Sequence, residues 1–147
     1  MRIDNKPKFT CNINQNLEQI VELYFQEKII NYFQDKQAKN WKISTLNDLI
    51  KISSGKRPLN KVNLKNNEFN ILVLGATAIN SYTNKFSYVN PILLVGRVGT
   101  LGVIQRINFK SFPSDNTLVI LSDVYEYVFQ MLKRINYEIL NIESTQP

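Results

Sequence analysis

The chain has 147 residues, of which 44% are hydrophobic and 20% are charged. This length allows one compact core, and five glycines with five prolines are too few for a collagenous or linker-dominated chain. Histidine is absent and cysteine occurs once, so the chain alone cannot form a His-based triad, a Cys/His zinc site or a disulfide. No convincing set of paired acidic residues replaces them. We therefore expect no enzymatic activity, no metal site and no cofactor.

The sequence also lacks the features of membrane and exported proteins. No apolar stretch approaches the ~20 residues that a membrane-spanning helix needs. The polar N-terminus has no apolar core of the kind that a signal peptide requires. We expect a cytoplasmic protein with no membrane partner.

The net charge of +6, from 18 basic and 12 acidic residues, is unevenly distributed. Residues 41–110 contain ten basic and two acidic residues, whereas residues 1–40 are nearly balanced and residues 111–147 are net acidic. A basic block attracts polyanions, and nucleic acid is the usual intracellular polyanion. Solubility alone would also account for it.

The first predicted element is a helix. The first 15 residues are polar and include Pro7, which predicts a flexible lead-in. Between residues 17 and 33 apolar residues recur at helical spacing, which predicts an amphipathic helix capped by Asn14 or Asn16. Lys28 interrupts the apolar stripe, which then drifts around the helix. The helix is too short to form a coiled coil alone and needs a partner to pack against.

Residues 34–40 are polar throughout and predict a domain boundary. We expect a first domain at residues 1–40, formed by the lead-in and the helix, and a second at residues 41–147.

Within the second domain, short apolar runs separated by turn residues predict strands. The predicted strands cover residues 41–45, 71–74, 92–95, 101–104 and 117–121. Residues 46–52 are typical of one or two helical turns, and residues 124–139 keep one apolar face, which predicts a helix capped by Asp123. Strands in the middle with flanking helices indicate the α+β class with a mixed or antiparallel sheet.

A glycine-rich segment follows the third predicted strand. Gly96, Gly99 and Gly102 fit neither of the phosphate-loop patterns, so we interpret them as sites of tight turns or close backbone packing. Arg97 has a planar fork of donors that suits a phosphate or a guanine edge. Asp115 could equally be its partner, although residues 114–116 follow a proline and are typical of a structural turn rather than of a catalytic acid.

Two further segments suit contacts with nucleic acid. Lys56 and Arg57 lie in a constrained loop and could clamp a backbone phosphate, or could form an ordinary solvated pair. Residues 77–88 are rich in side chains that both donate and accept hydrogen bonds, as base-edge readout requires, although a plain polar loop has the same composition. The candidates in this segment are Asn80, Tyr82, Asn84 and Lys85.

The order of these motifs is more specific than any one of them. Residues 49–58, 75–79, 91–102 and 114–117, taken in order, resemble the target recognition domain of the DNA specificity (S) subunit of type I restriction-modification systems. The Gly-Arg-Val-Gly-Thr-Leu-Gly run carries the resemblance most strongly. The helix at residues 17–33 is similar to the end of the long connector helix that precedes a recognition domain in that family.

The resemblance implies a non-catalytic subunit that reads double-stranded DNA and directs methyltransferase and restriction subunits to a target site. It favours seven residues as DNA contacts: Lys56, Arg57, Asn80, Tyr82, Asn84, Lys85 and Arg97. A full S subunit carries two recognition domains and two such helices, so we expect the domain at residues 41–147 to be incomplete at its C-terminus. A second copy or another half specificity subunit would then be a partner. The alternatives are a truncated, non-functional remnant and a protein-interaction module that no longer reads DNA.

Overall fold

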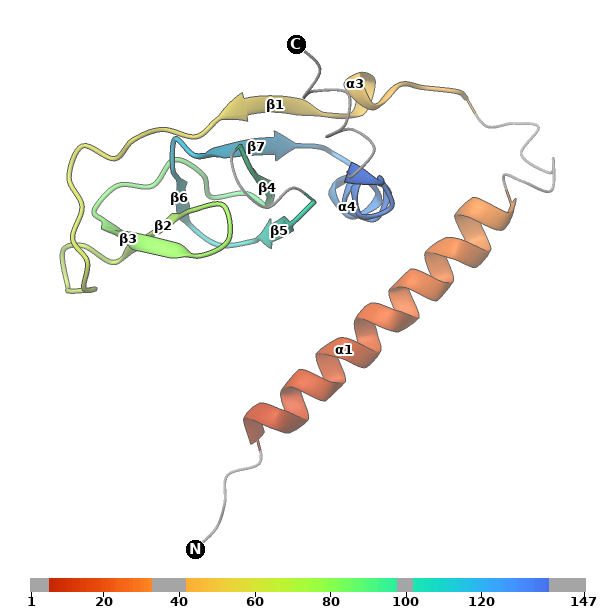
Figure 1. Ribbon diagram of the computed structural model, residues 1–147, viewed down its shortest axis with the longest axis horizontal. Helices are drawn as coiled ribbons and strands as arrows, with labels where there is room; N and C mark the ends of the chain where they lie inside the picture. The colour runs from red at the N-terminus through yellow and green to blue at the C-terminus, as the bar shows by residue number, and fades with distance from the viewer. Residues whose placement is uncertain (1–5, 33–41, 98–101, 138–147) are drawn as a thin grey trace, which may run out of the picture. The chain divides into compact units, whose positions relative to one another are not determined.

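The computed structural model describes residues 6–32, 42–97 and 102–137 (Figure 1). The chain divides into two compact units, Met1–Ile43 and Ser44–Pro147. None of the helices in the described ranges is both long enough and apolar enough to cross a membrane.

Residues 6–32 of the first unit form one long helical segment. Helix α1, Lys6–Phe25, begins about ten residues earlier than expected, so the predicted lead-in is wrong from Lys6 onward. Pro7 is compatible with this start, because proline is tolerated in the first turn of a helix. Ile13 precedes Leu17 by four residues and extends the same apolar stripe toward the N-terminus.

The early start of α1 also changes the expected role of two residues. The π-helical turn that follows α1 changes the course of the apolar stripe. Asn14 and Asn16 lie inside the helix and are not its caps. The π-helical turn η1, Gln26–Asn31, follows α1 directly. A π-turn contains one residue more than an α-turn, so Ile29 rather than Lys28 continues the stripe. Consistently, Ile29 is half-buried and Lys28 is exposed.

In the described residues of the second unit there are two small sheets and two helices (Figure 1). Its elements are α3 Leu46–Leu49, β1 Lys51–Ser54, β2 Ile71–Leu74, β3 Ile79–Thr83, β4 Ile92–Gly96, β5 Ile104–Ile107, β6 Ser111–Pro113, β7 Thr117–Leu121 and α4 Tyr125–Lys133. Sheet A has the strand order β1-β7-β4-β5 and is antiparallel throughout. Sheet B has the order β3-β2-β6, in which β2 pairs antiparallel with β3 and parallel with β6. The predicted α+β class with mixed and antiparallel pairing is confirmed.

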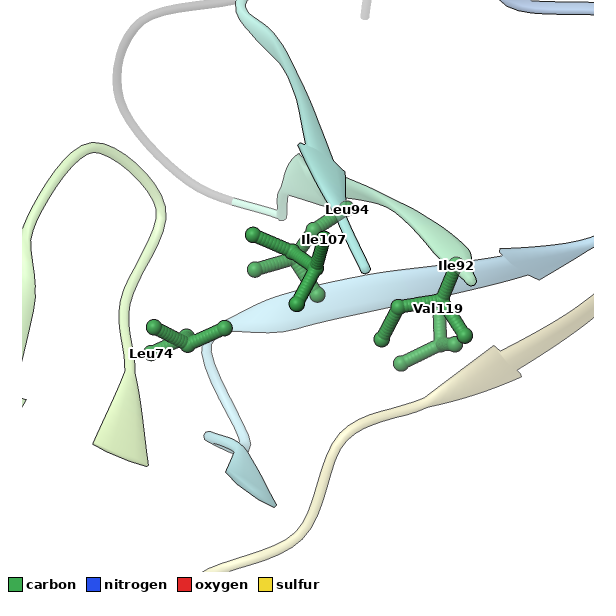
Figure 2. Packing of buried hydrophobic residues seen from close by; sticks show 5 residues of the cluster. All are labelled: Leu74, Ile92, Leu94, Ile107 and Val119. Carbon is green, nitrogen blue, oxygen red and sulfur yellow. The ribbon is translucent and has the colours of Figure 1, made fainter. Parts of the chain in front are cut away.

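The central strand β4 is buried on both faces. Ile92 and Leu94 belong to a cluster that β2, β5 and β7 complete with Leu74, Ile107 and Val119 (Figure 2). Alternation along a strand turns Leu93 to the opposite face, where it packs with residues of α4. An apolar run without alternation is what a strand covered on both sides requires.

Two predictions at the start of the second unit need correction. Residues 42–45 form no strand, and Trp41 lies outside the described residues. The helical turn ends at Leu49, and β1 takes up the rest of the predicted helical stretch. Thr45 and Asp48 form a capping box that starts α3; hydrogen bonds from Thr45 and Ser44 hold the pKa of Asp48 below its usual value.

Further corrections concern β5 and α4. β5 begins at Ile104 because Gly102 adopts a left-handed backbone with φ 82°, typical of a turn. α4 begins at Tyr125 and ends at Lys133, short of the predicted residue 139, which lies outside the described residues. Asp123 makes no capping bond; instead the Ser122 hydroxyl accepts one from the backbone of Val124.

Candidate nucleic-acid interface

The loop after β1 is held closely against the turn between β6 and β7. The backbone N–H of Gly55 donates to Thr117 at 2.9 Å, and that of Lys56 donates to Pro113 at 3.0 Å. A side chain at Gly55 would collide with the Ser114 carbonyl oxygen and lie 2.7 Å from Thr117 Oγ1. Glycine is therefore required here, because the two backbones approach each other closely. This contact fixes the position of the loop and so of the next two residues, Lys56 and Arg57.

Both candidate arginines meet at the β6–β7 turn. The guanidinium of Arg57 donates to the Asp115 carboxylate, with Nε and Nη2 each 3.0 Å from Oδ2. Arg97 donates from Nη1 to the Asp115 carbonyl oxygen at 3.4 Å and from its backbone to Asn116 at 2.9 Å. The carboxylate that was a possible partner of Arg97 thus pairs with Arg57. An exposed ion pair of this kind contributes ~0–1 kcal/mol, so it can be exchanged for another anion.

The turn itself has the structural role that its sequence predicts. The hydroxyl of Thr117 donates to the Ser114 carbonyl at 2.6 Å, and the Thr117 backbone donates to the same oxygen at 3.0 Å. Asp115 lies at the tip of this turn and pairs with Arg57.

A pocket of about 230 Å³ brings most of the predicted residues together. It is lined by Lys56, Arg57, Leu59, Asn60, Thr83, Asn84, Lys85 and Phe112. Lys56 and Arg57, in the loop after β1, therefore face Lys85, which follows β3, although about 25 residues separate the two segments in the sequence.

Strand β3 was not predicted, and it decides which polar residues reach the pocket. Thr83 is buried and donates from its hydroxyl to the Asn60 carbonyl at 2.8 Å, which ties β3 to the loop after β1. Tyr82 points to the other face of the strand, is half-buried and does not line the pocket. Asn80 is part of β3, and its side chain is not described.

The electrostatics of this region are strongly one-sided. Lys56, Arg57, Lys85 and Arg97 are all exposed, and of these four only Arg57 forms an ion pair within the described residues, with the Asp115 carboxylate. Such an excess of cations attracts phosphate groups. In the described part of the chain, no three acidic or cysteine side chains come together to bind a metal ion.

Sequence reasoning missed four lining residues: Leu59, Asn60, Phe112 and Thr83, the last of which lies within the polar segment singled out at residues 77–88. Leu59 and Asn60 follow the predicted cationic loop directly, so extending that loop by two residues would have included them. Nothing in the sequence marks Phe112 as a residue of the pocket, because its position depends on the pairing of the three-residue strand β6 with β2. Of the glycines singled out beside Arg97, Gly96 is buried at the end of β4 and Gly99 lies outside the described residues.

The chain has the fold of a specificity subunit of a type I restriction-modification system. The crystal structure of the S subunit from M. genitalium matches it with a TM-score of 0.58 and 17% sequence identity. The match covers 92% of this chain and 38% of that subunit, so the chain spans less than half of the subunit's length. No family model and no curated protein matches the sequence. The predicted resemblance is thereby confirmed at the level of the fold.

Proposed function

We propose that this chain is a non-catalytic DNA-recognition component of a type I restriction-modification system. The observation that carries the proposal is the pocket where Lys56, Arg57 and Lys85 converge with Asn84, on a fold shared with an S subunit. Cations bind phosphates without reading sequence, whereas amide side chains can read base edges. A surface that combines cations with amide side chains suits double-stranded DNA. We propose that the chain acts in the cytoplasm.

The residues divide into two roles under this proposal. Lys56, Arg57 and Arg97 bind backbone phosphates, and Arg57 exchanges its Asp115 partner for a phosphate when DNA arrives. Asn84 follows β3 directly and approaches base edges from the other side of the pocket, where Lys85 beside it binds a further phosphate. Asn80 and Tyr82 remain predicted contacts, of which Tyr82 lies outside the pocket.

The proposal is tested by duplex binding of the full chain at low salt, followed by fluorescence anisotropy. The Lys56→Ala/Arg57→Ala variant should lose about tenfold or more in affinity, and its salt slope should fall by about 2, because two phosphate contacts are lost. Lys61→Ala/Lys65→Ala removes the same charge from exposed positions outside the pocket and is the matched control. Equal losses in both variants would show that net charge alone drives binding.

Partner subunits are proposed to bind α1. Its apolar stripe is largely open to solvent, with Ile13 48%, Leu17 54%, Ile20 60% and Tyr24 64% exposed. The spacing of four, three and four residues is the heptad pattern of helices that pack along a seam. We propose methyltransferase and restriction subunits as occupants, and also a second copy or another half specificity subunit.

A protein-interaction module that does not read DNA is the second candidate, and the same exposed stripe favours it. Leu17→Glu/Ile20→Glu should abolish co-purification with a methyltransferase subunit, whereas Gln19→Glu, a charge change at another exposed position of α1, should not. Capture that depends on the stripe, together with no duplex binding at low salt, would select this second candidate over DNA recognition.

A further inference from the structure

An exposed aromatic ring lies beside the proposed phosphate-binding pocket. Phe86 is 51% exposed and directly follows Lys85, which lines the pocket. The ammonium group of Lys110 lies 5.4 Å from the centre of the Phe86 ring. Much of the ring therefore remains accessible, with one cation over it and another beside it in the chain.

The backbone around Phe86 is fixed by strand β6. The next two residues, Ser87 and Tyr88, donate backbone hydrogen bonds to the Ser111 carbonyl at 3.0 and 3.2 Å. Ser111 returns one to Tyr88 at 3.1 Å. Its neighbour Phe112 lines the pocket, so the same strand positions the ring and one wall of the pocket. The backbone next to the ring is thus fixed, although the surface of the ring is open.

An exposed ring with one lysine over it and another beside it in the chain suits a nucleobase better than an apolar partner. Bases stack on aromatic side chains whatever their identity, and flanking cations bind the phosphates on either side of the stacked nucleotide. A base inside an intact duplex cannot be reached by such a ring, so the contact requires local unstacking. An apolar protein partner would have to bury both ammonium groups, which is unfavourable without acidic residues to pair with them.

We propose that Phe86 stacks on a base that is unstacked from the DNA bound at the pocket, with Lys85 and Lys110 binding the adjoining phosphates. This inference rests on the proposed DNA-recognition function and adds to it that the bound duplex is locally opened. Duplexes in which a base is already unpaired should then bind more tightly, since part of the unstacking has been done beforehand.

The experiment compares the affinity of the full chain for a paired duplex and for the same duplex carrying one unpaired adenine. The wild-type chain should prefer the bulged duplex by roughly fivefold or more, the range expected for one base–aromatic stack. Phe86→Ala and Phe86→Leu should reduce this ratio to about one, Phe86→Trp should restore it, and all should keep the salt slope of paired-duplex binding. The control is Leu64→Ala, which truncates an apolar side chain that is 81% exposed and away from the pocket.

The possible results separate this inference from the function on which it rests. If Phe86→Ala keeps the preference, or Leu64→Ala loses it equally, stacking on Phe86 is refuted. If the wild-type chain binds paired duplex in a salt-dependent manner without preferring the bulge, the inference fails and DNA recognition stands. If the wild-type chain binds neither DNA at low salt, both fail.

Discussion

Sheets A and B of the second unit differ in what they bury. In sheet A, Ile92, Leu93 and Leu94 are fully buried between two apolar clusters. In sheet B, the buried side chains include the hydroxyls of Ser81 and Ser111, which have no hydrogen-bond partner among the described residues. An unpaired buried hydroxyl costs about 1–3 kcal/mol. Sheet A therefore contributes most of the buried apolar side chains of the two sheets, while sheet B buries unpaired polar groups and forms part of the pocket wall with Thr83 and Phe112.

The largest effect expected from this division is the loss of stability when a buried side chain of sheet A is truncated. Leu93→Ala should lower the free energy of unfolding by about 2–5 kcal/mol, because the residue is fully buried against α4 and leaves a cavity. Urea denaturation followed by circular dichroism measures it, with the exposed Leu64→Ala as the control within about 0.5 kcal/mol of wild type. DNA affinity of the folded fraction should not change. A loss of affinity without a loss of stability would show that the two sheets are not divided in this way.

An intermediate effect is expected where the two sheets meet. Gly55→Ala forces a methyl group into the Ser114 carbonyl, so the loop after β1 must move away from the β6–β7 turn. We expect a stability loss of about 1–3 kcal/mol, and a fall in duplex affinity at least as large as that of Lys56→Ala/Arg57→Ala. Gly75→Ala, at a buried position after β2, is the comparison variant. Unchanged affinity in Gly55→Ala would mean that the position of this loop does not matter for binding.

The smallest effect is expected from a variant that tests the proposed phosphate-binding role of Arg57. Asp115→Asn removes the carboxylate that pairs with Arg57 and should raise duplex affinity about two- to fivefold, since one anion near the phosphates is lost. Stability should change by less than about 1 kcal/mol, because the ion pair is largely exposed. Asp123→Asn removes the same charge before α4, outside the pocket, and should have a weaker effect. A lower affinity in Asp115→Asn would indicate that the carboxylate orients Arg57 for DNA.

The strands that the sequence predicted correctly are those with continuous apolar runs. β2 and β7 were found at their observed bounds and β4 to within one residue, because burial on both sides leaves a strong signal. β3 was interpreted as a polar loop, since Asn, Ser, Tyr and Thr do not reveal that Ser81 and Thr83 are buried. The expected strand at residues 41–45 has the apolar–polar alternation of a strand, yet residues 42–45 pair with no strand in the described chain. Alternation specifies a strand only when a partner strand is available.

The order of strand-like and helical stretches was enough to predict the fold class, and the basic block and the order of motifs selected the cations of the proposed interface. Those properties are local, since charge and short-range periodicity need no knowledge of distant residues. The tertiary structure alone decided that Lys56 and Arg57 face Lys85 across a pocket, that Asp115 pairs with Arg57, and that Tyr82 points elsewhere. Each of these depends on which strands pair and in which register, and a shift of one residue would turn every side chain of a strand to its other face.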